Sequence, residues 1–280
     1  MSDYCHDNCW SGANIGFQLF RFTTMPFMKP MSFPIGSPPV VIGGMGDSGT
    51  RDIARILKQA GFWMGSRVNP QTEDAMAPRL LLEKAFIHLV REGDEADAKW
   101  VGLFSKLIQV HRKDMADQDG LWGWKNPRSM WIIPFLSRVY PDMKFIHVVK
   151  DGRDIAMSED RSLLKRYGYS LLDDREERQQ EMARQFRLWA VGNMRAWEDG
   201  KKYLGDNYMV VNYETLCSNP CEQLPRLFRH CGITCNEQLV DDAKKHLHQE
   251  RTGHWRKSEN LMFHHPNKEV KDALKLFGYL

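Results

Sequence analysis

The stretch VVIGGMGDSGT, residues 40–50, decides the fold because a glycine-rich turn in it joins a β-branched strand to an amphipathic helix. After the turn, apolar residues recur at the spacing of one buried helical face: Ile53, Ile56, Leu57 and Ala60. The turn therefore lies at a helix N-terminus, where unpaired N–H groups and the positive end of the helix dipole favour an anion. The sequence predicts a phosphate-binding loop.

The loop departs from the pattern of ATP- and GTP-binding proteins. The pattern G-x-x-x-x-G-K-[ST] fits from Gly44 to Gly49, but Thr50 stands where the lysine is required. A strand followed by Ser-Gly-Thr, with no lysine after the glycine, instead resembles the 5′-phosphosulfate loop of the sulfotransferases that use 3′-phosphoadenosine 5′-phosphosulfate (PAPS). An ordinary strand-to-helix turn that needs glycine for its backbone angles is the alternative.

In that resemblance, the loop holds the 5′-phosphate of the donor. Backbone N–H groups from Gly46 through Gly49 to Thr50, with the hydroxyls of Ser48 and Thr50, are expected to bind it. Arg51 follows directly and is expected to reach the same phosphosulfate group.

A second motif follows about a hundred residues later. The run KFIHVV, residues 144–149, reads as a buried strand, and KDGRDIAMS follows it at residues 150–158. This resembles the family's 3′-phosphate segment, in which a basic residue ends the strand and a serine eight positions later lies on the next helix. Lys150 and Ser158 match those places, although the family more often has arginine first, and lysine lacks its bidentate fork. The alternative is a solvated charge run at a strand end.

Three further segments match the family in order along the chain: WKNPR (124–128), YMVVNYE (208–214) and RTGHW (251–255). The resemblance implies that Lys125 contacts the sulfuryl group and that Tyr213 lies near the adenine. It also implies that Arg251 and Gly253 belong to a segment that closes over the 3′-phosphate. Taken alone, each could be a core or surface residue.

The implied reaction is transfer of a sulfuryl group from PAPS to a hydroxyl or amine, which leaves 3′,5′-adenosine bisphosphate (PAP). The protein must neutralise the sulfuryl and bridging oxygens and align the acceptor in line with the leaving group. Lys125 is the expected cation on the transferring group, and no metal ion is expected. A small-molecule acceptor is expected because no long basic face suited to a polyanion is visible.

Asp47 is the main departure from the family, which usually has lysine or arginine directly before Ser-Gly-Thr. A carboxylate ~4 Å from the phosphosulfate would repel it by roughly 4 kcal/mol at an effective dielectric near 20. Asp47 could turn away while Arg51 or Lys125 supplies the cation, it could face the acceptor and anchor or deprotonate it, or the protein could bind nucleotide without catalysis. We favour the first two together, which points to a cationic acceptor.

The family's catalytic histidine, two residues after the lysine, is replaced by Pro127. Candidate replacements in the middle region are His88, His111 and Glu83, and no spacing distinguishes them. Two other functions stay open: a P-loop kinase-like phosphoryl transferase, which would need the missing lysine and magnesium, and a nucleotide-binding protein without catalysis.

Composition agrees with an enzyme of one large α/β domain. The chain has 280 residues, 42% hydrophobic and 27% charged, and its net charge of +3 is too small to indicate nucleic-acid binding. No apolar run is long enough for a membrane helix and no signal peptide is visible, so a cytoplasmic protein is expected. Residues 1–38 read as an irregular leader and residues 39–280 as a single domain, which is a monomer or a homodimer.

Strands and helices alternate along that domain. Strands are predicted over 39–43, 144–149 and 207–212, and helices over 50–60, 78–92, 128–139, 153–165, 176–200, 219–230 and 236–248. Strands separated by helices predict an α/β fold: a P-loop-like three-layer sandwich whose central parallel sheet is flanked by helices. Ligands in such sheets lie beyond the carboxyl ends of the strands, where the motifs fall.

The six cysteines form three pairs of one spacing: Cys5/Cys9, Cys217/Cys221 and Cys231/Cys235. Zinc sites more often show other spacings with histidines at fixed distances, so free thiols are expected for a cytoplasmic protein.

Overall fold

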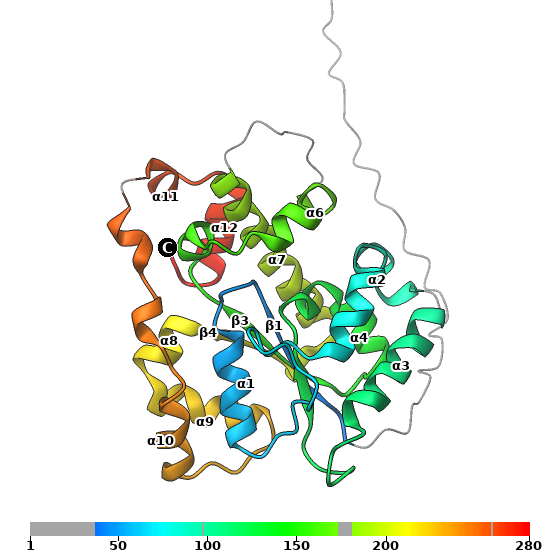
Figure 1. The fold of residues 1–280 in the computed structure, drawn as a ribbon. Coiled ribbons are helices and arrows are strands. Elements are labelled where there is room, and N and C mark those ends of the chain that lie inside the picture. Colours follow the sequence, from blue (N-terminus) through cyan, green and yellow to red (C-terminus); the bar gives the residue numbers. More distant parts are fainter. Residues whose placement is uncertain (1–36, 97, 173–180, 259) are drawn as a thin grey trace, which may run out of the picture.

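A parallel sheet of four strands forms the centre of the computed structural model (Figure 1), which describes residues 37–96, 98–172, 181–258 and 260–280. The strands are β1 (Val40–Gly44), β2 (Gly123–Lys125), β3 (Lys144–Val149) and β4 (Tyr208–Asn212), in the spatial order β2-β1-β3-β4. Because every pair is parallel, all four carboxyl ends meet at one edge of the sheet.

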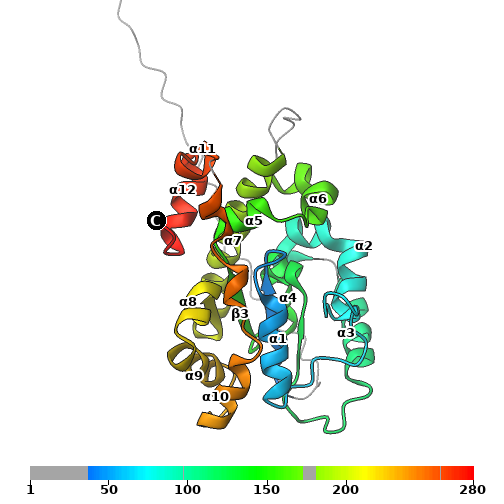
Figure 2. The same ribbon diagram turned by 60° about the vertical axis from the view of Figure 1, so that its left-hand side comes forward.

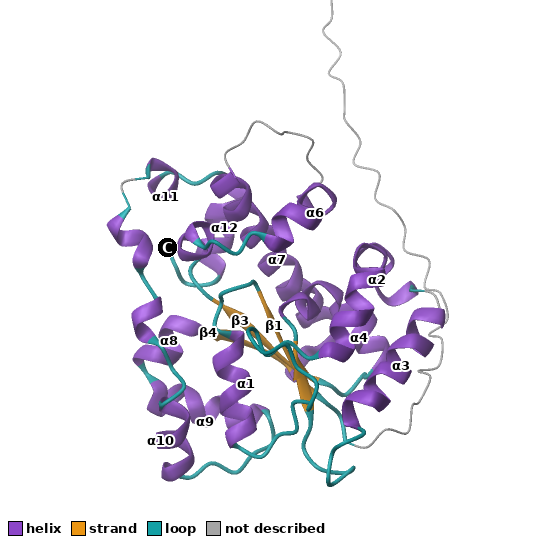
Figure 3. Ribbon diagram, viewed as in Figure 1, coloured by secondary structure: helices purple, strands orange, loops and turns teal. Residues whose placement is uncertain are grey.

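Helices cover both faces of the sheet (Figure 3). One layer contains α1 (Thr50–Gln59), α8 (Tyr213–Ser218), α9 (Pro220–His230) and α10 (Glu237–Lys244). The other side carries α2 (Met76–Glu92), α3 (Ala98–Arg112), α4 (Ile133–Val139), α5 (Gly152–Met157), α6 (Ser162–Leu172), α7 (Glu181–Leu204), α11 (Leu261–His264) and α12 (Lys268–Leu276). Figure 2 shows α8–α10 on one side of the molecule and α2 and α3 on the other.

The alternation of side chains along the strands produces two cores. Val40 and Ile42 of β1 pack with α1 and with α8–α10, whereas Val41 packs into the larger core of the opposite layer. Successive strand residues point to opposite faces, so a strand buried on both sides must be apolar throughout. All five residues of β1 are buried accordingly. The predicted three-layer sandwich is confirmed.

Several boundaries differ from the sequence-based prediction. The segment predicted as helix 128–139 begins as a 3-10 turn at Pro127–Ile132 and becomes α-helical only at Ile133. The last predicted helix ends at Lys244, and α3, β2 and α12 were not predicted. The start of the helix predicted at residue 176 lies outside the described residues, as does nearly all of the leader predicted over 1–38.

The single helix predicted over 153–165 is wrong: α5 ends at Met157 and α6 begins at Ser162. Polar side chains in the break take up the backbone donors, since Asp160 N–H donates to Ser158 Oγ over 3.1 Å and Ser162 N–H donates to Asp160 Oδ1 over 3.0 Å. Such local hydrogen bonds compete with the helical ones and end the helix. Ser158 therefore lies at the C-cap of α5 and not within a helix.

No helix in the described part of the chain is both long and apolar enough to cross a membrane.

Candidate active site

The loop between β1 and α1 is folded tightly against its neighbours. Gly49 has φ = 92°, in the left-handed region, and a Cβ atom there would lie 2.2 Å from the Tyr213 ring. A Cβ on Gly44 would lie 2.4 Å from the Val148 carbonyl oxygen. Both positions therefore require glycine, and α1 begins at Thr50 directly behind the loop, so its free N–H groups face the carboxyl edge of the sheet.

Two groups around the loop lack a partner. Ser48 is buried, and its Oγ has no hydrogen-bond partner among the described residues. Lys150, at the end of the neighbouring strand β3, is 8% exposed, and its ammonium makes no hydrogen bond or ion pair in the described part of the chain. A buried hydroxyl and a largely desolvated cation without acceptors are costly unless a ligand supplies the oxygens.

Asp47 contacts Ser158. Asp47 is exposed, with φ = 60°, and its Oδ2 accepts a hydrogen bond from Ser158 Oγ. The carboxylate therefore faces the residue predicted to bind the 3′-phosphate and is not among the residues that line the cavity described below. Arg51, half-buried in the first turn of α1, forms no ion pair or side-chain hydrogen bond with the described residues.

Helix α5 holds the C-terminal segment in place. The Asp154 carboxylate accepts hydrogen bonds from Gly253 N–H over 2.6 Å and from Trp255 N–H over 2.9 Å. Arg153 lies over the Trp255 ring, 3.6 Å from its centroid, and pairs with Asp151 over 2.7 Å. Residues 253–255, which include the predicted site residue Gly253, are therefore held against α5, the helix that follows Lys150.

Tyr213 packs against Gly49 of the β1–α1 loop. It is 1% exposed, and its hydroxyl donates to Asp52 Oδ2, while the Tyr213 hydroxyl oxygen accepts the His248 N–H over 3.2 Å. Burial raises the pKa of the Tyr213 hydroxyl, and the hydrogen bond to Asp52 adds to this effect. Arg251 is half-exposed, with Nη1 4.0 Å from Asp52 Oδ1. The structure therefore places Tyr213 and Arg251 on one carboxylate in α1.

Lys125 ends β2 and is fixed by a neighbouring loop. Its Nζ donates to Asp74 Oδ1 over 2.6 Å and to the Thr72 carbonyl over 2.9 Å. Burial lowers the pKa of Lys125, the Asp74 carboxylate opposes this shift, and the positive charge of Arg51 adds to it. An ammonium has three N–H donors, so one remains for a ligand.

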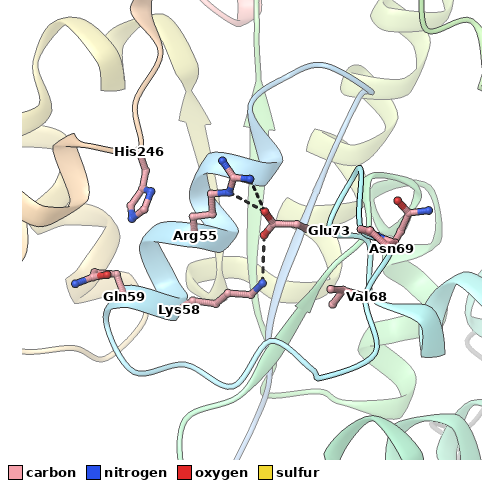
Figure 4. A pocket seen from close by; sticks show the side chains of 8 residues that line it. Arg55, Lys58, Gln59, Val68, Asn69, Glu73 and His246 are labelled. Atoms are coloured by element: carbon pink, nitrogen blue, oxygen red, sulfur yellow. Dashed lines mark hydrogen bonds and ion pairs between the residues drawn. The ribbon is translucent and has the colours of Figure 1, made fainter.

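The loop that holds Lys125 is itself attached to α1 through Glu73. Figure 4 shows Arg55 and Lys58 of α1 converging on the Glu73 carboxylate, over 2.7 and 3.2 Å. Burial opposes ionisation of Glu73, but the two hydrogen bonds prevail and lower its pKa. These three residues line a groove together with Gln59 and His246. Because their charges are paired with one another, we infer that this groove holds the loop that contacts Lys125 in position and is not a ligand site.

A cavity of about 340 Å³ opens beside the loop. It is lined by Gly44 at the end of β1 and Gly46 of the loop, by residues of the 69–83 segment, by Asp160 and residues of α6, and by Asn126, Pro127, Arg128 and Trp131 after β2. The cavity is adjacent to both the loop and the Lys125 partner Asp74 and is the candidate acceptor site.

Of the three candidate bases, Glu83 lines this cavity and forms an ion pair with Arg79 over 2.9 Å. His88 is exposed on α2 beside Trp100. His111 is buried and its Nε2 lies 2.9 Å from the Gly123 carbonyl oxygen, and burial lowers its pKa. The geometry leaves Glu83 as the one of these three that can reach an acceptor in the cavity.

Sequence reasoning missed the two carboxylates that position the site. Asp74 lies 51 residues from Lys125, and Asp154 lies 101 residues from Trp255. Neither pairing follows a local period, although an Asp inside the 150–158 motif was a signal that could have drawn attention to the second.

Four of the cysteines, Cys217, Cys221, Cys231 and Cys235, are free thiols, whereas Cys5 and Cys9 lie outside the described residues. Within the described ranges, no group of three or more His, Cys, Asp or Glu residues is arranged to hold a metal ion.

The profile of the sulfotransferase family matches residues 38–237. Among solved structures, the chain is similar to the sulfotransferase domain of the curacin biosynthetic pathway, at 14% identity and a TM-score of 0.55, over 88% of this chain and 99% of that one. It is similar to the sulfotransferase domain of the Synechococcus PCC 7002 olefin synthase, also at 14% identity and a TM-score of 0.55, over 91% and 99%. A search of curated protein sequences gave no significant match.

Proposed function

The chain belongs to the sulfotransferase family and is an enzyme of sulfuryl transfer, and from this premise we propose that PAPS is the donor and a small molecule the acceptor. The acceptor would present a hydroxyl or an amine. The observation that carries the proposal is that three features meet at one edge of the sheet: the N-terminus of α1 behind the glycine loop, the Ser48 Oγ and the Lys150 ammonium, the last two without a partner among the described residues. We also propose that residues 39–280 act as one domain in the cytoplasm, as a monomer or a homodimer.

The donor fits these residues. The loop N–H groups from Gly46 to Thr50 and the Ser48 and Thr50 hydroxyls would hold the 5′ group at the N-terminus of α1. Lys150 and Ser158 would hold the 3′-phosphate. This arrangement would account for the separation of the two anion-binding points on neighbouring strands, β1 and β3.

Two cations would act on the transferring group. Lys125 keeps one N–H free after its bonds to Asp74 and Thr72, and Arg51 lies near enough to lower the pKa of Lys125. Charge that develops on the sulfuryl and bridging oxygens would be stabilised by groups already fixed in position. In the cavity, the Glu83 carboxylate is the proposed acceptor of the proton that a hydroxyl or amine releases.

The placement of Asp47 removes the basis for a cationic acceptor. That expectation required Asp47 to face the acceptor, whereas its carboxylate accepts a hydrogen bond from Ser158. Tyr213, Arg251 and Gly253 remain proposed parts of the donor site, with Tyr213 acting through the support of the loop at Gly49.

Replacing the Asp47 carboxylate should strengthen donor binding. In Asp47→Asn the hydrogen bond to Ser158 can persist while a negative charge close to the donor phosphates is removed. We expect affinity for PAP to rise about tenfold, equivalent to ~1.4 kcal/mol. Calorimetric titration would measure it, with Asp114→Asn, an exposed carboxylate beside Ser66, as the control for net charge. Weaker binding in Asp47→Asn would instead show that the carboxylate orients Ser158 for the ligand.

Transfer itself is tested with ³⁵S-labelled PAPS and a panel of small hydroxy and amino compounds. Acceptor-dependent appearance of labelled product together with PAP is the expected result, and it should persist in the presence of a metal chelator. Release of labelled inorganic sulfate alone, with no labelled organic product in any reaction, would argue against the proposed transfer.

A further inference from the structure

The cavity beside the loop contains more charged groups than a site for a purely apolar acceptor requires. Among its lining residues, two carboxylates are already paired: Asp74 with Lys125 over 2.6 Å, and Glu83 with Arg79, which also lines the cavity, over 2.9 Å. Asp160 is exposed, and its Oδ1 accepts the Ser162 N–H. These groups are engaged before any acceptor enters.

Arg128 differs from them. Its side chain is half-buried and lies 5.8 Å from the Phe86 ring centroid, and it forms no hydrogen bond or ion pair with the described residues. Burial lowers the pKa of its guanidinium, while the neighbouring groups Tyr167, Asp74 and Glu83 oppose that shift. Arg128 lines the cavity itself, together with Tyr167, Asp74 and Glu83.

Two further donors in the same wall lack acceptors. Asn126 is fully buried and Trp131 is 1% exposed, and neither Asn126 Nδ2 nor Trp131 Nε1 has a hydrogen-bond partner in the described ranges. Asn126 Oδ1 is occupied by the Arg128 N–H over 3.1 Å, which fixes the orientation of the amide. Both nitrogens are buried away from the open cavity, so these residues build the wall, and the half-buried Arg128 guanidinium presents its N–H donors to an oxygen-rich group there.

We propose that this cavity selects acceptors that carry an anionic oxygen group, a carboxylate, sulfonate or phosphate, which pairs with the Arg128 guanidinium. The planar fork of arginine matches such groups bidentately. Arg166 of α6 is exposed on the same cavity and adds positive charge. The inference rests on the proposed function in one respect, namely that the cavity beside the loop is the acceptor site.

The test uses five para-substituted phenols of one size: 4-hydroxybenzoate, 4-hydroxybenzenesulfonate, 4-hydroxyphenylphosphonate, neutral 4-hydroxybenzamide and cationic 4-hydroxybenzylamine. Each is titrated calorimetrically into the full-length protein, with and without saturating PAP. We expect at least one anion to bind about tenfold more tightly than the amide, and Arg128→Gln to abolish that preference. The anion that binds best identifies the chemical group.

Two further variants make the result specific. Arg128→Lys keeps the charge without the fork and should retain part of the preference, and Arg226→Gln, an exposed arginine on α9, should retain all of it. Unchanged PAP affinity in Arg128→Gln shows that the variant is folded. The proposal is overturned if the amide or the amine binds as tightly as every anion, if no anion binds to protein that binds PAP, or if Arg128→Gln keeps the preference. Failure to bind PAP, with the anion preference intact, would reject the proposed donor and leave this inference standing.

Discussion

Lys150→Ala should lower the affinity for PAP about 30-fold while leaving the affinity for adenosine 5′-monophosphate nearly unchanged. The Lys150 ammonium is 8% exposed and without a partner in the described part of the chain, so its contact with the 3′-phosphate would be a charge-assisted hydrogen bond from an already desolvated donor. Such bonds contribute ~1.5–3 kcal/mol, which corresponds to roughly 10- to 150-fold in affinity. Calorimetric titration with both nucleotides measures the difference.

The matched control is Lys144→Ala, at the opposite end of the same strand. It removes an equal charge from β3 but lies at the amino edge of the sheet, away from the loop, so both affinities should stay within about threefold of the wild type. If Lys150→Ala weakened both nucleotides equally, Lys150 would not be reading the 3′-phosphate, and the donor assignment would lose its most specific residue.

Gly49→Ala should abolish measurable PAP binding and destabilise the protein by about 2–5 kcal/mol, since backbone strain of ~1–2 kcal/mol adds to an overpacking cost of ~1–3 kcal/mol. The strain arises because Gly49 has φ = 92°, and the overpacking because its Cβ would lie 2.2 Å from the Tyr213 ring. Tyr213 is fixed by Asp52 and the His248 N–H, so the loop must move instead of the ring. Chemical denaturation and calorimetric titration give the two quantities.

Gly61→Ala separates the two causes. Gly61 has φ = 91°, nearly the same backbone conformation, but nothing lies within 4 Å of a Cβ built there. It should therefore show the strain cost of ~1–2 kcal/mol and bind PAP normally. Equal stability losses in the two variants, with PAP binding kept in both, would mean that the packing of Tyr213 on Gly49 does not set the shape of the loop.

The elements that could be predicted from the sequence are those in which apolar residues cluster or recur at the spacing of a strand or a helix. The bounds predicted for β3 are the observed ones, because four apolar residues, Phe145, Ile146, Val148 and Val149, fall between Lys144 and Lys150. Helix α3 also carries such a pattern, because its buried residues Val101, Phe104 and Ile108 recur at helical spacing, although the sequence-based prediction did not include this helix. Strand β2 has only three residues, too few for any period to be visible.

The site could be predicted only in part, for the same reason. The loop of residues 46–50 and Lys150 are defined by short local patterns, and the structure brings them to one edge of the sheet. The contacts that position the site join distant residues: Lys125 with Asp74, Asp154 with Gly253, and Asp47 with Ser158. Each depends on how loops pack in three dimensions, which a single sequence does not encode in any spacing.

The most direct test of the account is titration of the wild-type protein with PAP, adenosine 5′-monophosphate, and ADP with magnesium. With separate anion-binding points at the β1 loop and at Lys150, we expect PAP to bind about 30-fold more tightly than the monophosphate, and ADP with magnesium to compete poorly. Tighter binding of ADP with magnesium than of PAP would contradict the account, because it would mean that the loop serves a phosphoryl donor and that the site at Lys150 does not recognise a 3′-phosphate.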